Sequence, residues 1–422
     1  MPPTHDTSGR LPEGFLVGGA LCAHQVEGGD FHSDWWRWEQ RPSRIADGAT
    51  SEVAADHWNR HREDTALSAK LGMNALCLGL SWARIQPEPG AVDTAALDHY
   101  RAVLDGALKH AMTPVVVLQE FAAPHWFTAG GGWSNPRAPG QFRAYAEAVA
   151  GALADRCRWW VPIAAPEYWL TRAHVERAWP GGDSGGCACA AAREHLAAAH
   201  REAVSALRAA RPDLLAGASV RAYDVEPRDP DSPWDWQAAE RLRRRLNHIF
   251  LDRLRGGAEK PFDFILLEWG GAVQAAFSPF RRHFSWARIT GDTGLDGAAG
   301  NAGGFDTALL SFHPHGVPLL VSVSCNSSGT DGERCRFLRD HLEKVIGRVT
   351  GESPMALAGF FYRPLLDGFE WEHGYTRKRG LLHVNPDGLA RTPNGSAYLL
   401  GDVAEHGRLR AGTVRRFCGP EA

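Results

Sequence analysis

The sequence predicts an α/β fold with a parallel sheet, and two observations support this prediction. Short apolar runs recur along the chain, at residues 114–118, 159–164, 214–219, 262–267, 317–323 and 356–361. Longer amphipathic stretches lie between them, at residues 93–109, 138–155, 190–210 and 332–348. A run that is apolar throughout indicates a strand buried on both faces, as a parallel sheet covered by helices requires.

Taken in order along the chain, the predicted strands and helices alternate. This alternation indicates βαβ units with right-handed crossovers, which either close into a barrel or form a doubly wound sheet. No Gly-x-Gly-x-x-Gly motif follows the first predicted strand, which weakens a dinucleotide-binding interpretation. The Gly/Pro-rich connections at residues 180–186 and 291–304 are typical of loops that decorate one end of a barrel.

Length and composition indicate one globular domain. The chain has 422 residues, of which 44% are hydrophobic and 23% are charged, the balance of an ordinary soluble protein with a large core. Because α/β barrels often exceed about 250 residues as one unit, we expect a single domain over residues 1–422. Residues 1–10 and 410–422 are expected to be flexible tails.

Charge and cysteine content exclude several kinds of partner. A net charge of -3 gives no basic surface for nucleic acid, and no apolar run approaches the length of a membrane span or signal peptide. The eight cysteines are scattered, except for Cys187 and Cys189, and indicate reduced thiols rather than disulfides or a zinc site. We therefore expect a cytoplasmic protein with no nucleic-acid or membrane partner and no metal or cofactor.

Several short motifs of rare residue types follow one another between about residues 10 and 405. They include His24-Gln25, Ser81-Trp82, Pro124-His125-Trp126, Leu365-Leu366-Asp367, Phe369-Glu370-Trp371 and Gly374-Tyr375. In order and spacing these motifs resemble family 1 glycoside hydrolases. The resemblance implies a (β/α)8 barrel, the TIM-barrel fold, with a sugar-sized pocket at the C-terminal ends of the strands.

The resemblance also implies that both catalytic glutamates of the family are missing. Retaining glycosidases need two carboxyl groups about 5–5.5 Å apart, and the family places them at the ends of the fourth and seventh strands. Aligned on Pro166, the acid/base position is Ala165. The nucleophile position is Val323 in a gap-free alignment, or Cys325 if the alignment is shifted to match Asn326. Neither placement leaves a carboxylate.

Neighbouring positions differ from the family pattern as well. The Arg beside the family's nucleophile corresponds to Cys77, a sugar-binding His to Glu120, an Asn to Glu268 and a Trp at the floor of the pocket to Arg363. New acids at two strand ends indicate a remodelled site, because buried carboxylates are costly unless they are paired, protonated or used as acid and base. Glu167, just beyond the acid/base position, is a further candidate proton donor.

Part of the sugar-binding machinery of the family is retained. Gln25 and Glu370 would bind hydroxyl groups by hydrogen bonds, and the Trp371 indole would stack on an apolar sugar face. Three residues beside these positions and the new acids are also expected to contact the substrate: His24, Phe121 and Trp269.

The leading hypothesis is a repurposed enzyme that binds a glycosylated or polyhydroxylated small molecule. It would perform acid/base chemistry other than retaining hydrolysis through Glu120, Glu268, Glu167 and Arg363. The Ala/Arg/Gly-rich composition is associated with GC-rich bacterial genomes and so with bacterial specialised metabolism. One alternative is a catalytically silent sugar-binding pseudo-glycosidase, in which Arg363 merely pairs with Glu120 or Glu268. Another is an atypical β-glycosidase with relocated carboxylates and Glu167 as its acid.

Overall fold

The computed structural model describes residues 9–182, 186–256, 260–280, 287–290, 301–325 and 329–419. Most of the tail predicted at residues 1–10, most of the loop at 291–304 and the alternative alignment anchor Asn326 lie outside these residues.

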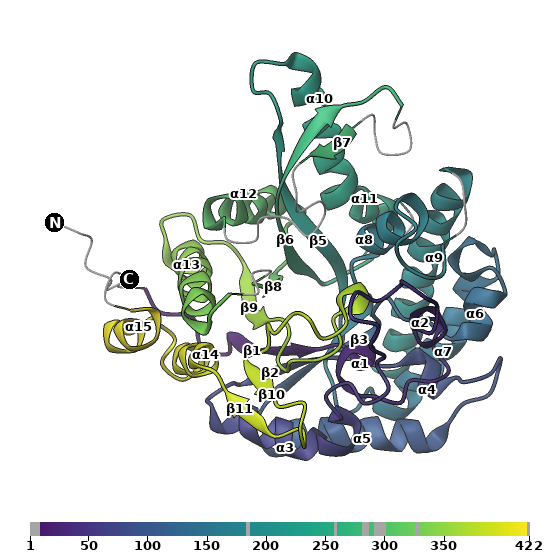
Figure 1. The fold of residues 1–422 in the computed structure, drawn as a ribbon, viewed down its shortest axis with the longest axis horizontal. Helices are drawn as coiled ribbons and strands as arrows, with labels where there is room; N and C mark the ends of the chain where they lie inside the picture. The colour runs from purple at the N-terminus through teal and green to yellow at the C-terminus, as the bar shows by residue number, and fades with distance from the viewer. Residues whose placement is uncertain are drawn as a thin grey trace.

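Eight parallel strands close into a barrel (Figure 1). They are β1 (Leu16–Leu21), β2 (Ala75–Gly79), β3 (Thr113–Gln119), β4 (Trp159–Ile163), β5 (Leu215–Pro227), β6 (Phe264–Phe277), β8 (Leu319–Val323) and β9 (Leu357–Tyr362). Neighbours follow the order β5-β4-β3-β2-β1-β9-β8-β6, and pairing of β5 with β6 completes the ring. The predicted (β/α)8 barrel is confirmed, and the doubly wound alternative is wrong.

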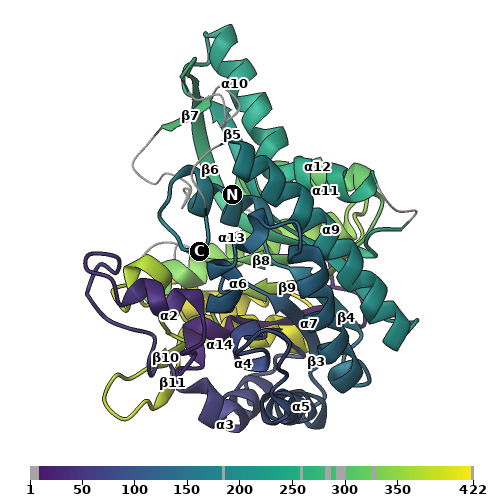
Figure 2. The same ribbon diagram turned by 90° about the vertical axis from the view of Figure 1, so that its right-hand side faces the viewer.

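Helices surround the barrel (Figures 1 and 2). The longer ones are α3 (His57–Lys70), α5 (Thr94–Lys109), α7 (Ala138–Leu153), α9 (Gly186–Ala210), α10 (Pro233–Arg243), α12 (Ala302–Phe312), α13 (Asp331–Thr350) and α14 (Gly395–His406). Shorter ones are α1 (Ala23–Val26), α2 (Asp34–Glu39), α4 (Trp82–Ile85), α6 (His125–Ala129), α8 (Pro166–Leu170), α11 (Ile249–Arg255) and α15 (Ala411–Cys418). Local sequence fixes their starts: α13 begins at a capping box in which Thr330 and Glu333 satisfy each other's backbone N–H groups.

Two strands are much longer than the sequence indicated. The apolar runs predicted strands at 214–219 and 262–267, but β5 extends to Pro227 and β6 to Phe277. Their distal halves pair with each other, and β6 also pairs with the antiparallel β7 (Ala287–Thr290). With α10 they form a lobe that rises beyond the barrel (Figures 1 and 2). In the distal halves of β5 and β6, exposed and half-buried residues interrupt the apolar pattern. The apolar runs in the sequence therefore end before the strands do.

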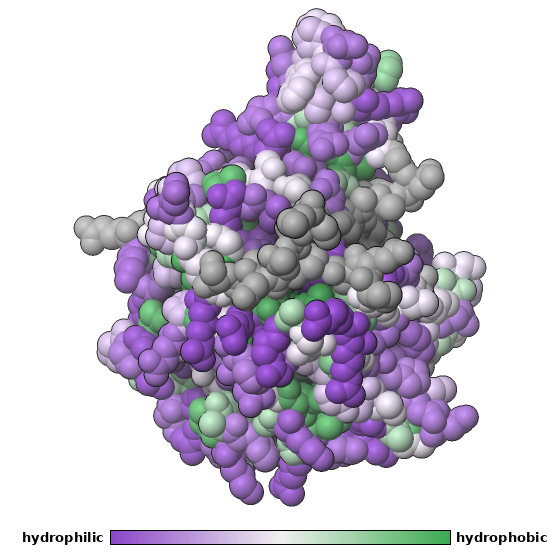
Figure 3. Space-filling model, turned by 90° about the vertical axis from the view of Figure 1, so that its left-hand side faces the viewer, coloured by the Kyte–Doolittle hydropathy of each residue, from purple (hydrophilic) through white to green (hydrophobic). Residues whose placement is uncertain are grey.

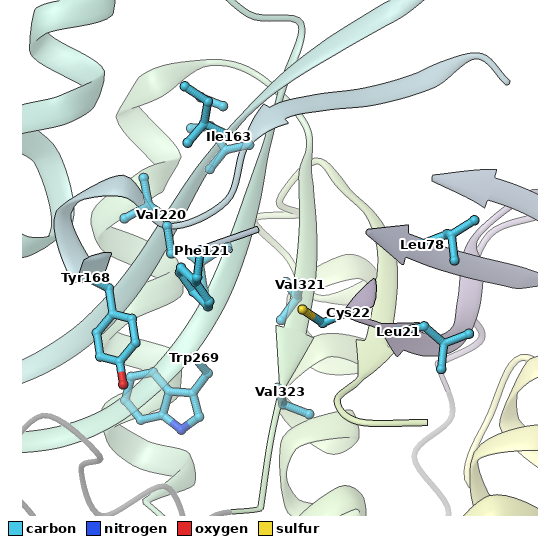
Figure 4. Packing of buried hydrophobic residues seen from close by; sticks show 14 of the residues in the cluster. Leu21, Cys22, Leu78, Phe121, Ile163, Tyr168, Val220, Trp269, Val321 and Val323 are labelled. Atoms are coloured by element: carbon cyan, nitrogen blue, oxygen red, sulfur yellow. The ribbon is translucent and has the colours of Figure 1, made fainter. Parts of the chain in front are cut away.

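Apolar side chains fill the barrel interior, among them Val115, Val161, Phe264, Leu320 and Phe361. A larger cluster lies between the strands and the helices; Figure 4 shows part of it, including Leu78, Ile163, Val220 and Val321. Because the interior is packed, space for a ligand is confined to the strand ends.

On the face seen in Figure 3 hydrophilic side chains predominate, and hydrophobic ones form small, separate patches. Among the described helices, none is long and apolar enough to cross a membrane. In the C-terminal segment predicted as a tail, residues Ala411–Cys418 form α15.

Candidate functional site

A narrow cavity lies at the C-terminal ends of the strands, where the sequence predicted the pocket. Its volume is about 60 Å³, room for about four water molecules at roughly 15 Å³ each. Seven of the ten predicted site residues line it: Gln25, Glu120, Phe121, Glu268, Arg363, Glu370 and Trp371. The structure thus brings together residues from the two ends of the sequence and from the middle of the chain.

Glu120 follows β3 directly and is 4% exposed. Its Oε1 accepts a short hydrogen bond from the Arg363 guanidinium, which follows β9. Its Oε2 has no hydrogen-bond partner in the described residues, and a Cβ at residue 79 would lie 3.0 Å from that atom. Gly79 therefore leaves room for the carboxylate, whose Oε2 is buried against the end of β2.

Glu268 lies on β6 and is 5% exposed. The Ser219 hydroxyl on β5 donates to Glu268 Oε1 at 3.3 Å, and Arg221 lies opposite Glu268 in the register of these strands. Burial raises the pKa of Glu268 above its ordinary value, although the Arg221 charge and the Ser219 hydrogen bond act in the opposite direction. Glu268 is therefore easier to protonate than an exposed glutamate.

Gln25 and Glu370 contact each other in the lining of the same cavity. Gln25 Nε2 donates to Glu370 Oε2 at 3.4 Å, and Arg379 forms a short ion pair with the same carboxylate. Arg379 also lies 3.4 Å from the Ser324 hydroxyl. Glu370 is 2% exposed, so its charge is held by the Arg379 cation rather than by water.

Aromatic and histidine side chains support this part of the cavity from behind. His24 stacks on Trp371 with ring centroids 5.7 Å apart, and it is absent from the cavity lining itself. Burial lowers the pKa of His24, but Asp30 and Glu39 outweigh this effect and raise it to about 9. A charged imidazole thus supports the indole, so His24 positions Trp371 rather than contacting a ligand in the cavity.

Two further predicted residues lie outside the cavity. The Arg193 guanidinium binds both oxygens of Glu167, with Nη2 3.0 Å from Oε2. Trp269 follows Glu268 on β6, and successive strand residues point to opposite faces, so its indole packs on Phe305 of α12 with ring centroids 5.7 Å apart. The structure does not bring Glu167 or Trp269 to the cavity.

The sequence predicted that Ala165 and either Val323 or Cys325 stand at the positions of the family's glutamates. Ala165 is buried at the start of α8 with φ 35°, and its N–H donates to the Ser219 hydroxyl at 3.1 Å. Val323 ends β8 and is buried (Figure 4), as is Cys325 just beyond it. Phe121 and Tyr168 lie to the left of Val323 in the same figure.

Sequence reasoning missed nine of the sixteen residues that line the cavity, among them Tyr168, Trp179, Arg221 and Arg379. Arg221 stands two residues beyond the strand predicted at 214–219, so its place at a strand end was a usable signal. Arg379 belongs to the basic run that follows Gly374-Tyr375, but only the folded chain brings it to Glu370. Within the described residues, no cluster of three or more His, Cys, Asp or Glu side chains has an arrangement that would hold a metal ion.

A closed barrel of eight parallel strands with a cavity lined by buried carboxylates at the strand ends places this chain in the class of TIM barrels, whose active sites lie at that end. The sequence matches Glycosyl hydrolase family 1 over residues 7–261 and 316–408. This chain belongs to that family. The unmatched residues 262–315 include β6, β7 and α12.

Individual relatives agree with this assignment. The chain is 25% identical to beta-glucosidase A of Acetivibrio thermocellus over 94% of this chain and 98% of that protein. It is 28% identical to the coniferin beta-glucosidase of Pinus contorta over 89% and 88%. A beta-glycosidase from Pyrococcus horikoshii superimposes with a TM-score of 0.88 at 25% identity, over 98% and 99%. The Thermotoga maritima beta-glucosidase in complex with glucoimidazole has the same fold, with a TM-score of 0.86 at 23% identity, over 95% and 100%.

Proposed function

We propose that this chain binds a glycosylated or polyhydroxylated small molecule and performs acid/base chemistry on it, other than retaining hydrolysis of β-glucosides. One observation carries the proposal: the buried carboxyl groups of Glu120 and Glu268 line the same cavity. The catalytic glutamates of the family are, in this proposal, replaced by Ala165 and Val323 or Cys325. A retaining mechanism lacks both its acid and its nucleophile without them.

The two carboxyl groups have different environments, as an acid and a base require. Burial favours the protonated form of Glu268, which would donate the proton. Glu120 forms an ion pair with Arg363, and its carboxylate would accept the proton. Elimination, isomerisation, cyclisation and atypical glycosyl cleavage are the reaction classes that need such a pair.

Gln25, Glu370 and Trp371 would hold the ligand. The amide and the carboxylate would bind hydroxyl groups, and the indole would cover an apolar face. A volume of about 60 Å³ is too small for a hexose, so binding also requires the Arg363 or Arg379 side chain to turn away from its glutamate. The proposal includes a cytoplasmic location in a bacterium, in specialised metabolism; the described cysteines are free and buried, as expected for a reducing compartment.

Three other functions compete with this proposal. The names of the relatives favour ordinary β-glucoside hydrolysis. The two Arg–Glu ion pairs within the cavity favour a silent sugar-binding protein, because they occupy the space that a ligand would need. A glycosidase with relocated carboxylates would use Glu167, but that side chain is bound to Arg193.

The first experiment tests ligand binding. The ligand would be deoxynojirimycin, which forms a complex with the Thermotoga maritima beta-glucosidase. It would be titrated by calorimetry into the wild type, the Glu370→Gln variant and the matched control Glu167→Gln. We expect Glu370→Gln to weaken binding at least tenfold and Glu167→Gln to leave it within twofold. Equal affinity in all three proteins would contradict the proposed binding residues.

Chemistry is tested by product analysis. Deuterium incorporation and product formation would be followed by NMR in D2O with a panel of β-glucosides, β-glucuronides and free sugar acids. We expect conversion by the wild type and at least a hundredfold slower conversion by Glu120→Gln and by Glu268→Gln, the size of effect that general acid/base catalysis supplies. Conversion that survives both substitutions contradicts the assigned roles, and sugar binding without any conversion favours the silent protein.

A further inference from the structure

A second hollow, here called the outer hollow, adjoins the cavity and is much larger. Its volume is about 460 Å³, within the range of about 300–1,000 Å³ typical of small-molecule sites. Trp179 lines both spaces. The indole of Trp179 donates to Glu372 Oε2 at 2.8 Å and packs on Trp371 with centroids 5.5 Å apart, so these contacts fix the position of the residue that both spaces share.

Positive charge dominates the outer hollow. Arg37 of α2, Arg41 and Arg177 line it, and Asp34 is the single acidic residue of its lining. Across the described ranges, no carboxylate forms an ion pair with any of these three arginines. The chain as a whole has a net charge of -3, so this local excess of cations is not a consequence of composition.

Asp34 does not neutralise this excess. Its Oδ1 accepts the Ala123 N–H at 3.0 Å, and its side chain lies buried beside the hollow. Burial raises the pKa of Asp34 to about 7, so near neutral pH the carboxyl group is often uncharged. The Arg41 guanidinium lies over the Trp38 ring, 5.2 Å from its centroid, and forms a cation–π contact with it.

We propose that the outer hollow binds an anionic group, and that the substrate is therefore an acidic glycoside. Its polyhydroxylated part would lie in the cavity and its carboxylate, sulfate or phosphate group would lie beyond Trp179, against Arg37, Arg41 and Arg177. Guanidinium groups suit this task because their planar donors match carboxylate and phosphate oxygens. The sugar part of this inference rests on the proposed function; the anion site does not.

The test uses three probes with the full chain: phenyl β-D-glucoside, 4-carboxyphenyl β-D-glucoside and benzoate. Affinities would be measured by calorimetry at low salt for the wild type, for Arg37→Gln/Arg177→Gln, and for Arg62→Gln/Arg244→Gln, which removes the same charge outside both hollows. We expect the carboxylated glucoside to bind at least about fivefold more tightly than the neutral one. Added salt should reduce this difference in affinity, because the arginines are exposed.

The variants decide the origin of this advantage. It should disappear in Arg37→Gln/Arg177→Gln and persist in Arg62→Gln/Arg244→Gln. Equal affinity for the two glucosides, or an equal loss in both double variants, overturns the inference. Benzoate binding that depends on Arg37 and Arg177 without binding of either glucoside supports the anion site and rejects the sugar site. No binding of any probe rejects both.

Discussion

The two sides of the cavity differ in how their carboxylates are held. On the binding side, defined here as Gln25, Glu370 and Trp371, Glu370 is engaged by both Gln25 and Arg379. On the acid side, defined as Glu120, Glu268 and Arg363, one oxygen of Glu120 has no partner in the described residues, and burial favours protonation of Glu268. In the proposed function, the binding side holds a fixed charge, whereas the acid side exchanges protons with the ligand.

The largest effect is expected when the acid side loses its cation. Arg363→Met leaves the carboxylate of Glu120 buried without a counter-charge, and breaking a buried pair in this way costs about 3–5 kcal/mol. Urea unfolding at pH 7 would measure the change. Adding Glu120→Gln should restore most of the lost stability; a double variant as unstable as Arg363→Met would show that the pair is not the cause.

The next effect concerns the support behind the binding side. The folded pKa of His24 is raised from 6.5 to about 9, so the protonated imidazole stabilises the fold fully below pH 6.5. This contribution is lost as the pH rises through 9. Relative to His24→Asn, we expect the wild type to lose on the order of 2–3 kcal/mol of unfolding free energy across that interval. Parallel pH profiles of the two proteins would contradict the assigned ion pairs with Asp30 and Glu39.

A smaller effect on the pH dependence of stability is expected from Glu268, and it is caused by burial rather than by ion pairs. Its folded pKa lies above the ordinary 4.5 because of burial, so above pH 4.5 the unfolded chain ionises before the folded one does. The wild type should therefore lose stability relative to Glu268→Gln as the pH rises from 4.5, until the folded carboxyl group also ionises. Unfolding curves of both proteins over this range would measure the difference. A gain in relative stability of the wild type would mean that Arg221 dominates.

The smallest effect on function is expected at Glu167. The Glu167→Asp variant keeps a carboxyl group beside Arg193 but alters its reach. Because Glu167 lies outside the cavity, deoxynojirimycin affinity should change less than twofold while the melting temperature falls. A tenfold change in affinity would place Glu167 in the site and remove the contrast between the two sides.

Much of the fold was predictable because barrel strands are apolar on both faces. The runs at 159–164 and 356–361 match β4 and β9 to within one residue. The distal halves of β5 and β6 were not predictable in this way, because they form a lobe with one exposed face and lose the continuous apolar pattern.

The site was predictable only in part, because motifs identify positions but not side-chain directions. Glu268 and Trp269 are adjacent in sequence, yet only Glu268 lines the cavity. Arg379 and Arg193 acquire their roles through contacts with Glu370 and Glu167 that no local pattern encodes. These ion pairs depend on the tertiary fold, which brings residues from separate strands and helices together.

In the proposed function, Ala165 and Val323 or Cys325 stand at the family's glutamate positions. We therefore expect an assay of nitrophenolate release from 4-nitrophenyl β-D-glucoside to find no release by the purified chain above a buffer blank. Turnover at about 1 s⁻¹ or faster, the range of ordinary enzymes, would contradict it and establish this chain as a β-glucosidase.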